Sequence, residues 1–145
     1  MRSCLYLALA LTLAACSSGD QAGGTLQLDR LKGQWVVINY WATWCKPCIH
    51  EIPELNSLAA LPTVTVLGVN YDGVEGERLA QQVEQLGIAF PILSVDPASQ
   101  LGVERPVVLP TTLVLDPQGK LRSTLVGPQT LQSLTEATGS DAGKQ

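Results

Sequence analysis

Basic residues, histidine and charge in general are scarce in this sequence. Of its 145 residues, 15% are charged, one is histidine, and the formal net charge is −4. The chain has no cluster of lysine and arginine, which a nucleic-acid partner needs along a groove or stripe to neutralise its phosphates. We therefore expect no nucleic-acid partner. The length predicts a single domain and excludes a multidomain enzyme.

A hydrophobic run long enough to span a membrane is also missing near the amino terminus. Residues 5–15 form an apolar stretch of 11 residues, whereas a spanning helix needs about 20. A basic residue precedes the stretch and small residues end it, which is typical of a secretory signal. The ending Leu-Ala-Ala-Cys at residues 13–16 resembles a bacterial lipobox. This resemblance implies that residues 1–15 are a signal peptide, that Cys16 carries a lipid anchor, and that residues 16–25 are a flexible tether.

Only two cysteines remain for chemistry in the expected mature chain. The sequence has four, but Cys4 would leave with the signal and Cys16 would carry the lipid. Cys45 and Cys48 are left, and one pair in an oxidising envelope is either a structural staple or a redox centre. A staple across so short a loop would remove little entropy from the unfolded chain, so the spacing favours the redox centre.

The same two cysteines do not suit a haem or a structural zinc. A c-type haem site needs histidine directly after the second cysteine, and position 49 is isoleucine. Structural zinc needs four ligands, and the chain offers the cysteine pair and His50, which would point to a different face of a helix. We expect His50 to be an exposed polar residue, and we expect no metal and no cofactor beyond the disulfide.

Strands and helices alternate along the rest of the chain. Continuous β-branched runs predict buried strands, and the turn residues Asp-Pro-Gln-Gly-Lys at 116–120 predict a hairpin. The pattern indicates an α/β sandwich with a mixed sheet, with the domain over 26–139 and a polar tail over 140–145. We expect a short edge strand within 26–31, strands over 35–40, 64–70, 91–95, 111–115 and 121–126, helices over 45–60, 76–86 and 128–138, and a helical turn over 96–102.

A Cys-x-x-Cys pair that follows a buried strand and begins a helix has a specific geometry. Residues i and i+3 of a helix lie one above the other, so the sulfurs of Cys45 and Cys48 can bond without backbone rearrangement. Cys45 would lie at the helix N-terminus, where unpaired N–H groups, the helix dipole and the neighbouring Lys46 favour a thiolate. We therefore expect Cys45 to attack disulfides and the more buried Cys48 to resolve the mixed disulfide.

The sequence around this pair carries a family resemblance. Residues 35–53, WVVINYWATWCKPCIHEIP, resemble the active-site strand and helix of the TlpA-like branch of the thioredoxin superfamily, and residues 109–119, LPTTLVLDPQG, resemble its cis-proline loop and hairpin. The resemblance extends over residues 26–138. It implies a thioredoxin-like three-layer sandwich, with helices on both faces of a mixed central sheet. It also implies a monomeric protein thiol–disulfide oxidoreductase.

The resemblance further implies which residues serve the pair. Pro110 would follow a cis peptide bond and face the sulfurs, while the backbone of Leu109 pairs with an extended partner segment. Glu51 lies three residues after Cys48 on the same helical edge and would be an acid or base that tunes the pair, the alternative being a solvated helix carboxylate. Asn39 stands where cytosolic thioredoxins have a titratable Asp, so that proton relay is absent. The expected substrate-contacting residues are Trp44, Lys46, Pro47, Leu109 and Thr111.

The implied activity is reduction of protein disulfides by a lipid-anchored enzyme of the bacterial cell envelope that faces the periplasm. A membrane electron carrier of the DsbD or CcdA type would recharge it, and its substrate would be an apocytochrome c or a copper-site protein. The main alternative is a carrier module that holds Cu(I) on the same cysteines, because thiolates suit that soft ion. A peroxidase is the weaker alternative, because no arginine lies near Cys45 in the sequence.

Overall fold

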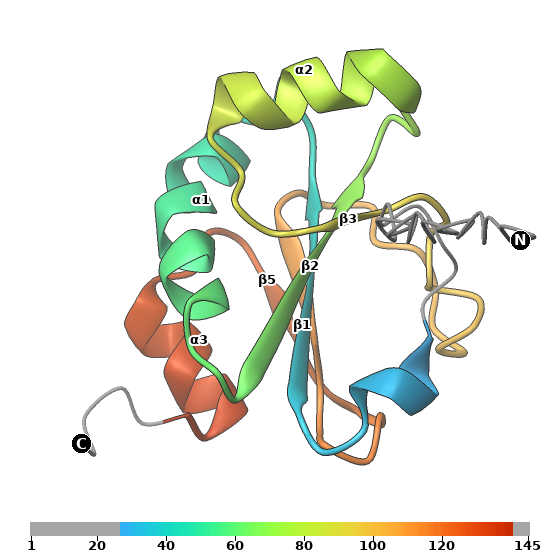
Figure 1. Ribbon diagram of the computed structural model, residues 1–145, viewed down its shortest axis with the longest axis vertical. Coiled ribbons are helices and arrows are strands. Elements are labelled where there is room, and N and C mark those ends of the chain that lie inside the picture. The colour runs from blue at the N-terminus through green and yellow to red at the C-terminus, as the bar shows by residue number, and fades with distance from the viewer. Residues whose placement is uncertain (1–26, 141–145) are drawn as a thin grey trace, which may run out of the picture.

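A central five-stranded mixed sheet organises the protein. The computed structural model describes residues 27–140, and Figure 1 shows their arrangement. The strand order is β3-β2-β1-β4-β5, with β1, β2 and β3 parallel and with β4 and β5 each antiparallel to its preceding neighbour. The elements in chain order are the 3-10 helix η1 (Leu28–Leu31), β1 (Trp35–Trp41), α1 (Lys46–Ala59), β2 (Val64–Asn70), α2 (Gly76–Leu86), β3 (Ile92–Leu93), β4 (Thr111–Leu115), β5 (Leu121–Val126) and α3 (Leu131–Thr138).

The central strand β1 is buried on both of its faces. Side chains alternate along a strand, and here the alternation feeds two separate hydrophobic clusters. Val37 and Trp41 belong to the cluster that contains both cysteines, whereas Val36, Ile38 and Tyr40 belong to the cluster on the opposite face. Burial on both faces explains why this strand is apolar in the sequence at every position except Asn39.

The three α-helices pack against the cluster that contains the cysteines. Leu55 of α1 and Leu134 of α3 lie in it, and Val83 of α2 packs against it; Figure 1 shows α1 and α3 along the same side of the sheet. The other face is covered by Leu31 of η1 and by Leu101, which lies in the helical turn predicted for residues 96–102. The predicted α/β sandwich is therefore confirmed, and its second outer layer consists of a 3-10 helix and a helical turn.

Three predicted elements differ from the structure in their type or by three residues in length. The prediction of an edge strand within residues 26–31 is wrong, since this segment forms the 3-10 helix η1. The helix packs Leu31 over a sheet face, and the following Gly33 N–H bonds to the Pro117 carbonyl. The strand expected over 91–95 is only Ile92–Leu93. Helix α3 starts at Leu131 rather than at residue 128, because Thr130 caps its first turn through a reciprocal pair of hydrogen bonds with Ser133.

Several predictions concern residues outside the described part of the chain. The signal peptide 1–15, the lipid site Cys16, the tether 16–25 and the tail beyond residue 140 all lie there. Among residues 27–140, no helix combines the length and the apolar character that crossing a membrane requires.

A glycine in β2 permits close packing within the cluster that contains the cysteines. A Cβ at Gly68 would lie 2.5 Å from Ile92 Cδ1, 3.0 Å from Trp41 Nε1 and 3.1 Å from Phe90 Cε2. We predict that Gly68→Ala lowers the free energy of unfolding by about 1–3 kcal/mol, because this space is already filled. Denaturant titration measures the loss, which should be smaller in an Ile92→Val background that lacks the nearest atom. Equal stability of Gly68→Ala and the wild type would contradict the prediction.

Candidate active site

A disulfide joins the two cysteines at the start of α1. The S–S distance between Cys45 and Cys48 is 1.98 Å and their Cα atoms are 5.3 Å apart, within the usual span of a disulfide. Cys45 is the N-cap residue of α1, and its Sγ accepts a hydrogen bond from the Cys48 N–H at 3.2 Å. Pro47 lies in the first helical turn, where its missing N–H leaves no bond unmade. The two sulfurs are thus placed by helix geometry, as the i, i+3 spacing predicts.

The disulfide lies just beneath an exposed rim. Cys45 is 4% exposed and Cys48 is 1% exposed, so Cys45 is the sulfur nearer to solvent. Trp44 is 63% exposed, and Lys46 and Pro47 are exposed beside it. Cys48 thus lies deeper than Cys45, and both lie beneath a rim of exposed side chains.

The loop that precedes β4 contains the cis peptide bond that the resemblance implies. It joins Leu109 to Pro110, and Leu109 packs against both the cluster that contains the cysteines and the cluster on the opposite face. Thr111 is 2% exposed, and its hydroxyl donates to the Val108 carbonyl at 2.8 Å. The structure therefore places the Thr111 side chain behind the loop, where it supports the loop shape, rather than on the surface that a substrate would touch.

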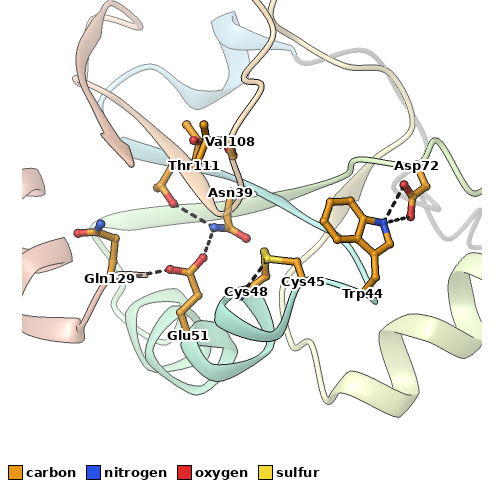
Figure 2. Close-up of a disulfide and its surroundings, with 10 residues drawn as sticks. Asn39, Trp44, Cys45, Cys48, Glu51, Asp72, Val108, Thr111 and Gln129 are labelled. Atoms are coloured by element: carbon orange, nitrogen blue, oxygen red, sulfur yellow. Dashed lines mark hydrogen bonds between the residues drawn. A yellow bond between two sulfur atoms is a disulfide. The ribbon is translucent and has the colours of Figure 1, made fainter. Parts of the chain in front are cut away.

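Glu51 is fully buried one helical turn beyond Cys48. It is 1% exposed, which excludes the solvated carboxylate that was the alternative. Asn39 Nδ2 donates to its Oε1 at 2.6 Å, and the Gln129 N–H donates to its Oε2 at 2.8 Å (Figure 2). Burial raises the pKa of Glu51, although the hydrogen bonds from Gln129 and Asn39 act in the opposite direction. A carboxyl group with this balance can hold or release a proton beside the cysteine pair.

Two features of the site could not be predicted from the sequence. Asn39 has no proton to relay, but its amide connects the acid to the sheet, since Nδ2 also donates to Thr112 Oγ1 at 3.0 Å. The Glu54 carboxylate accepts from the Leu131 N–H at 2.8 Å and so caps the first turn of α3. The partners in these bonds are as far apart in the sequence as 73 and 77 residues, so no local pattern signals them.

The exposed Trp44 side chain has a fixed orientation. Its indole N–H donates to both carboxylate oxygens of Asp72, at 3.2 and 3.1 Å, as Figure 2 shows. Its ring also meets the ring of Tyr71 edge-on, with the centroids 6.5 Å apart and the planes at 84°. Neither partner was among the site residues expected from the sequence. His50 is exposed, as expected.

Known proteins share both the fold and the cysteine chemistry. Thiol-disulfide oxidoreductase ResA of Bacillus thuringiensis (strain Al Hakam) is 32% identical over 119 residues, which cover 79% of this chain and 68% of that protein. Sporulation thiol-disulfide oxidoreductase A of Bacillus subtilis (strain 168) is 33% identical over 113 residues, covering 74% and 68%. The crystal structure of a secreted thiol-disulfide isomerase from Corynebacterium glutamicum superposes with a TM-score of 0.63 at 30% identity, covering 77% of this chain and 72% of that one.

The site geometry and these relatives define a thiol–disulfide oxidoreductase with a thioredoxin-like fold, similar to ResA and to sporulation thiol-disulfide oxidoreductase A. More particularly, the chain belongs to the AhpC/TSA family, which it matches over residues 8–124.

The buried acid predicts a specific pH dependence of stability. Above its ordinary pKa of 4.5, which burial raises, folded Glu51 keeps a proton that the unfolded chain has already released. The free energy of unfolding should therefore fall as the pH rises from the ordinary pKa to the raised one. Glu51→Gln removes this proton, and the Asn39 amide can turn over to pair with the new amide. The contribution of Glu51 to the slope should then disappear in denaturant titrations of the oxidised protein between about pH 4 and pH 8.

The control for this prediction is Glu54→Gln. Glu54 is the other carboxylate of α1, and it accepts a hydrogen bond from the Leu131 N–H at the start of α3. It should keep the slope of the wild type. An identical slope in wild type and Glu51→Gln would mean that Glu51 is not the group responsible.

Proposed function

We propose that this protein is a membrane-anchored, extracytoplasmic reductase of protein disulfides. The Cys45 thiolate attacks one sulfur of the partner's disulfide and forms a mixed disulfide, and the partner's other sulfur leaves as a thiolate and takes a proton. Cys48 then loses its proton and attacks Cys45 Sγ, which restores the Cys45–Cys48 disulfide and releases the partner's second sulfur. Two electrons pass to the partner, and a dithiol donor returns them.

The observation that carries this proposal is the disulfide at the start of α1 with Glu51 buried one turn further. The Cys48 N–H that now bonds to Cys45 Sγ is placed to stabilise the Cys45 thiolate after reduction. Glu51, as an ionised carboxylate, is the base that accepts the Cys48 proton in the resolving step. Pro110, in the cis-proline loop, contributes to catalysis by facing the sulfurs. Lys46 and Pro47 join Trp44 as the exposed surface that meets the partner.

The buried carboxyl also supports the direction of electron flow. A strongly oxidising dithiol catalyst is one whose reduced form is stabilised as a thiolate. A negative charge at Glu51 makes a second thiolate at Cys48 costly, which favours the return to the disulfide. This balance supports a reductant rather than an enzyme that introduces disulfides.

The cellular role follows from the predicted leader. Residues 1–15 would direct export and Cys16 would hold the protein on the membrane through its lipid, facing the periplasm. The match to a secreted isomerase supports an extracytoplasmic place. We propose a membrane donor of the DsbD or CcdA type, and an apocytochrome c or a copper-site protein as the substrate.

Redox equilibration tests the direction. In glutathione buffers of graded poise, we predict a reduction potential of the Cys45–Cys48 pair below about −200 mV, as for reducing dithiols. In the insulin assay with dithiothreitol, the wild type should accelerate reduction, and Cys45→Ser should fall to the uncatalysed rate. A potential near about −120 mV, the value of a strong oxidant, would contradict the reductase.

A Cu(I) titration separates the enzyme from a Cu(I) carrier. Soft thiolates can hold Cu(I), so the reduced protein is titrated with Cu(I) in parallel with the insulin assay. Tight retention of Cu(I) without acceleration of insulin reduction would favour the carrier.

Cys48→Ser should trap the partner on Cys45 as a mixed disulfide, and mass spectrometry of the trapped species identifies it.

A further inference from the structure

Trp44 is an exposed aromatic residue whose orientation is determined by its neighbours. It directly precedes Cys45, and most of its surface faces solvent. The Asp72 carboxylate holds its N–H and the Tyr71 ring meets its edge. A surface tryptophan without such contacts changes rotamer readily, so residues 71 and 72 select the orientation that a partner meets.

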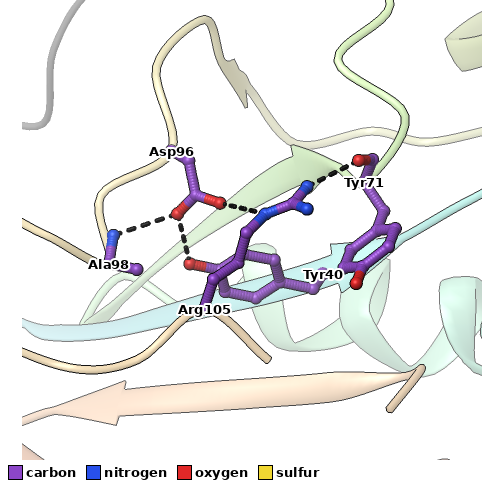
Figure 3. A network of polar contacts seen from close by, with 5 residues as sticks. All are labelled: Tyr40, Tyr71, Asp96, Ala98 and Arg105. Atoms are coloured by element: carbon purple, nitrogen blue, oxygen red, sulfur yellow. Dashed lines mark hydrogen bonds and ion pairs between the residues drawn. The ribbon is translucent and has the colours of Figure 1, made fainter. Parts of the chain in front are cut away.

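Tyr71 is itself held by Arg105. The Arg105 guanidinium lies over the Tyr71 ring, with Cζ 4.0 Å from the centroid, and Nη2 donates to the Tyr71 carbonyl at 2.6 Å. Figure 3 shows the guanidinium reaching Tyr71 from the segment that leads to the cis-proline loop. One arginine therefore fixes both the ring and the backbone of the residue that contacts Trp44.

Arg105 is anchored in turn by a carboxylate that is bound to the centre of the sheet. Its Nε donates to Asp96 Oδ2 at 2.8 Å, while Asp96 Oδ1 accepts from the Tyr40 hydroxyl at 2.7 Å and from the Ala98 N–H at 3.0 Å. Burial acts to raise the pKa of Asp96, but the hydrogen bonds from Tyr40, Ala98 and Arg105 outweigh it and lower the pKa. Asp96 is thus ionised at neutral pH and can hold the guanidinium.

We propose that Arg105 is a positioning residue for substrate recognition, which fixes Tyr71 and through it the indole of Trp44 beside Cys45. This inference rests on the proposed function, because the indole matters only for a protein partner. Arg105 lies in the segment that leads to Pro110, and its bond to the Tyr71 carbonyl ties that segment to the residue directly after β2. The guanidinium is suited to this task because its planar fork bonds Asp96 and the Tyr71 carbonyl together while it stacks on the ring.

The test compares Arg105→Gln with Arg122→Gln, a matched change at an exposed arginine of β5. The indole N–H resonance of Trp44, assigned by its loss in Trp44→Phe, reports the orientation in ¹⁵N spectra. For Arg105→Gln we expect this resonance to shift and the KM for insulin to rise about threefold to tenfold. The kcat, and the rate with a small aromatic disulfide, should stay within about twofold. Arg122→Gln should change none of these quantities.

Two further variants keep the test decisive. Arg105→Lys retains the charge beside Asp96 but lacks the planar guanidinium, so its KM should lie between those of wild type and Arg105→Gln. Arg105→Lys replaces Arg105→Gln in the test if the glutamine variant does not fold. Tyr71→Leu breaks the same connection further along, so Arg105→Gln combined with Tyr71→Leu should raise KM no more than the larger single effect. Fully additive effects would mean that the two residues act independently, and would overturn the proposal.

The outcomes also separate this proposal from the proposed function. If the wild type accelerates insulin reduction but Arg105→Gln leaves the Trp44 resonance and KM unchanged, the positioning role is wrong and the reductase stands. An equal loss with the protein substrate and the small disulfide would likewise overturn it, because the change would then have reached the cysteines. If the wild type itself reduces no protein disulfide, the proposed function fails first.

Discussion

The active site depends on satisfying one buried carboxyl group. Removing an ionised carboxylate from water without partners costs many kcal/mol, so Glu51 requires donors. They come from two other parts of the chain, the Asn39 side chain of β1 and the Gln129 N–H before α3. Any shift of α1 relative to β1 or α3 would break one of these bonds. The disulfide begins the same helix, so its position against the sheet is fixed by the same requirement.

Placing the acid on α1 rather than on β1 changes what it can do. An acid at position 39 would act on the cysteines from the facing strand, whereas Glu51 shares an edge of the helix with Cys48 and moves with it. Asn39 then has a different task, since its amide can donate to the carboxyl while it stays bonded to Thr112 next to the cis-proline loop. Proton chemistry and loop geometry are therefore connected through a residue that does not titrate.

The predictions from sequence succeeded where the cause is local and failed where it is distant. The Cys-x-x-Cys pair at a helix start, the buried strand β1 and the helix over 76–86 follow from patterns within a few residues, and each is present in the structure. The edge strand expected within 26–31 failed because tertiary packing of Leu31 decides the conformation of that segment. Contacts such as Gln129 to Glu51, 78 residues apart, and Arg105 to Tyr71, 34 apart, depend on strand order, which no local pattern encodes.

Two neighbouring residues of β1 serve the two sides of the proposed reaction. Successive side chains of a strand point to opposite faces, so Asn39 turns toward α1 and bonds to Glu51, while Tyr40 turns to the other face and bonds to Asp96. In the proposed mechanism, the first contact supports proton transfer at the cysteines, and the second supports Arg105, the residue that we propose positions Tyr71 and Trp44. Because both residues belong to a strand that is buried on both faces, neither network can shift without disturbing the core. A single strand therefore fixes the position of the proposed proton acceptor relative to the proposed recognition surface.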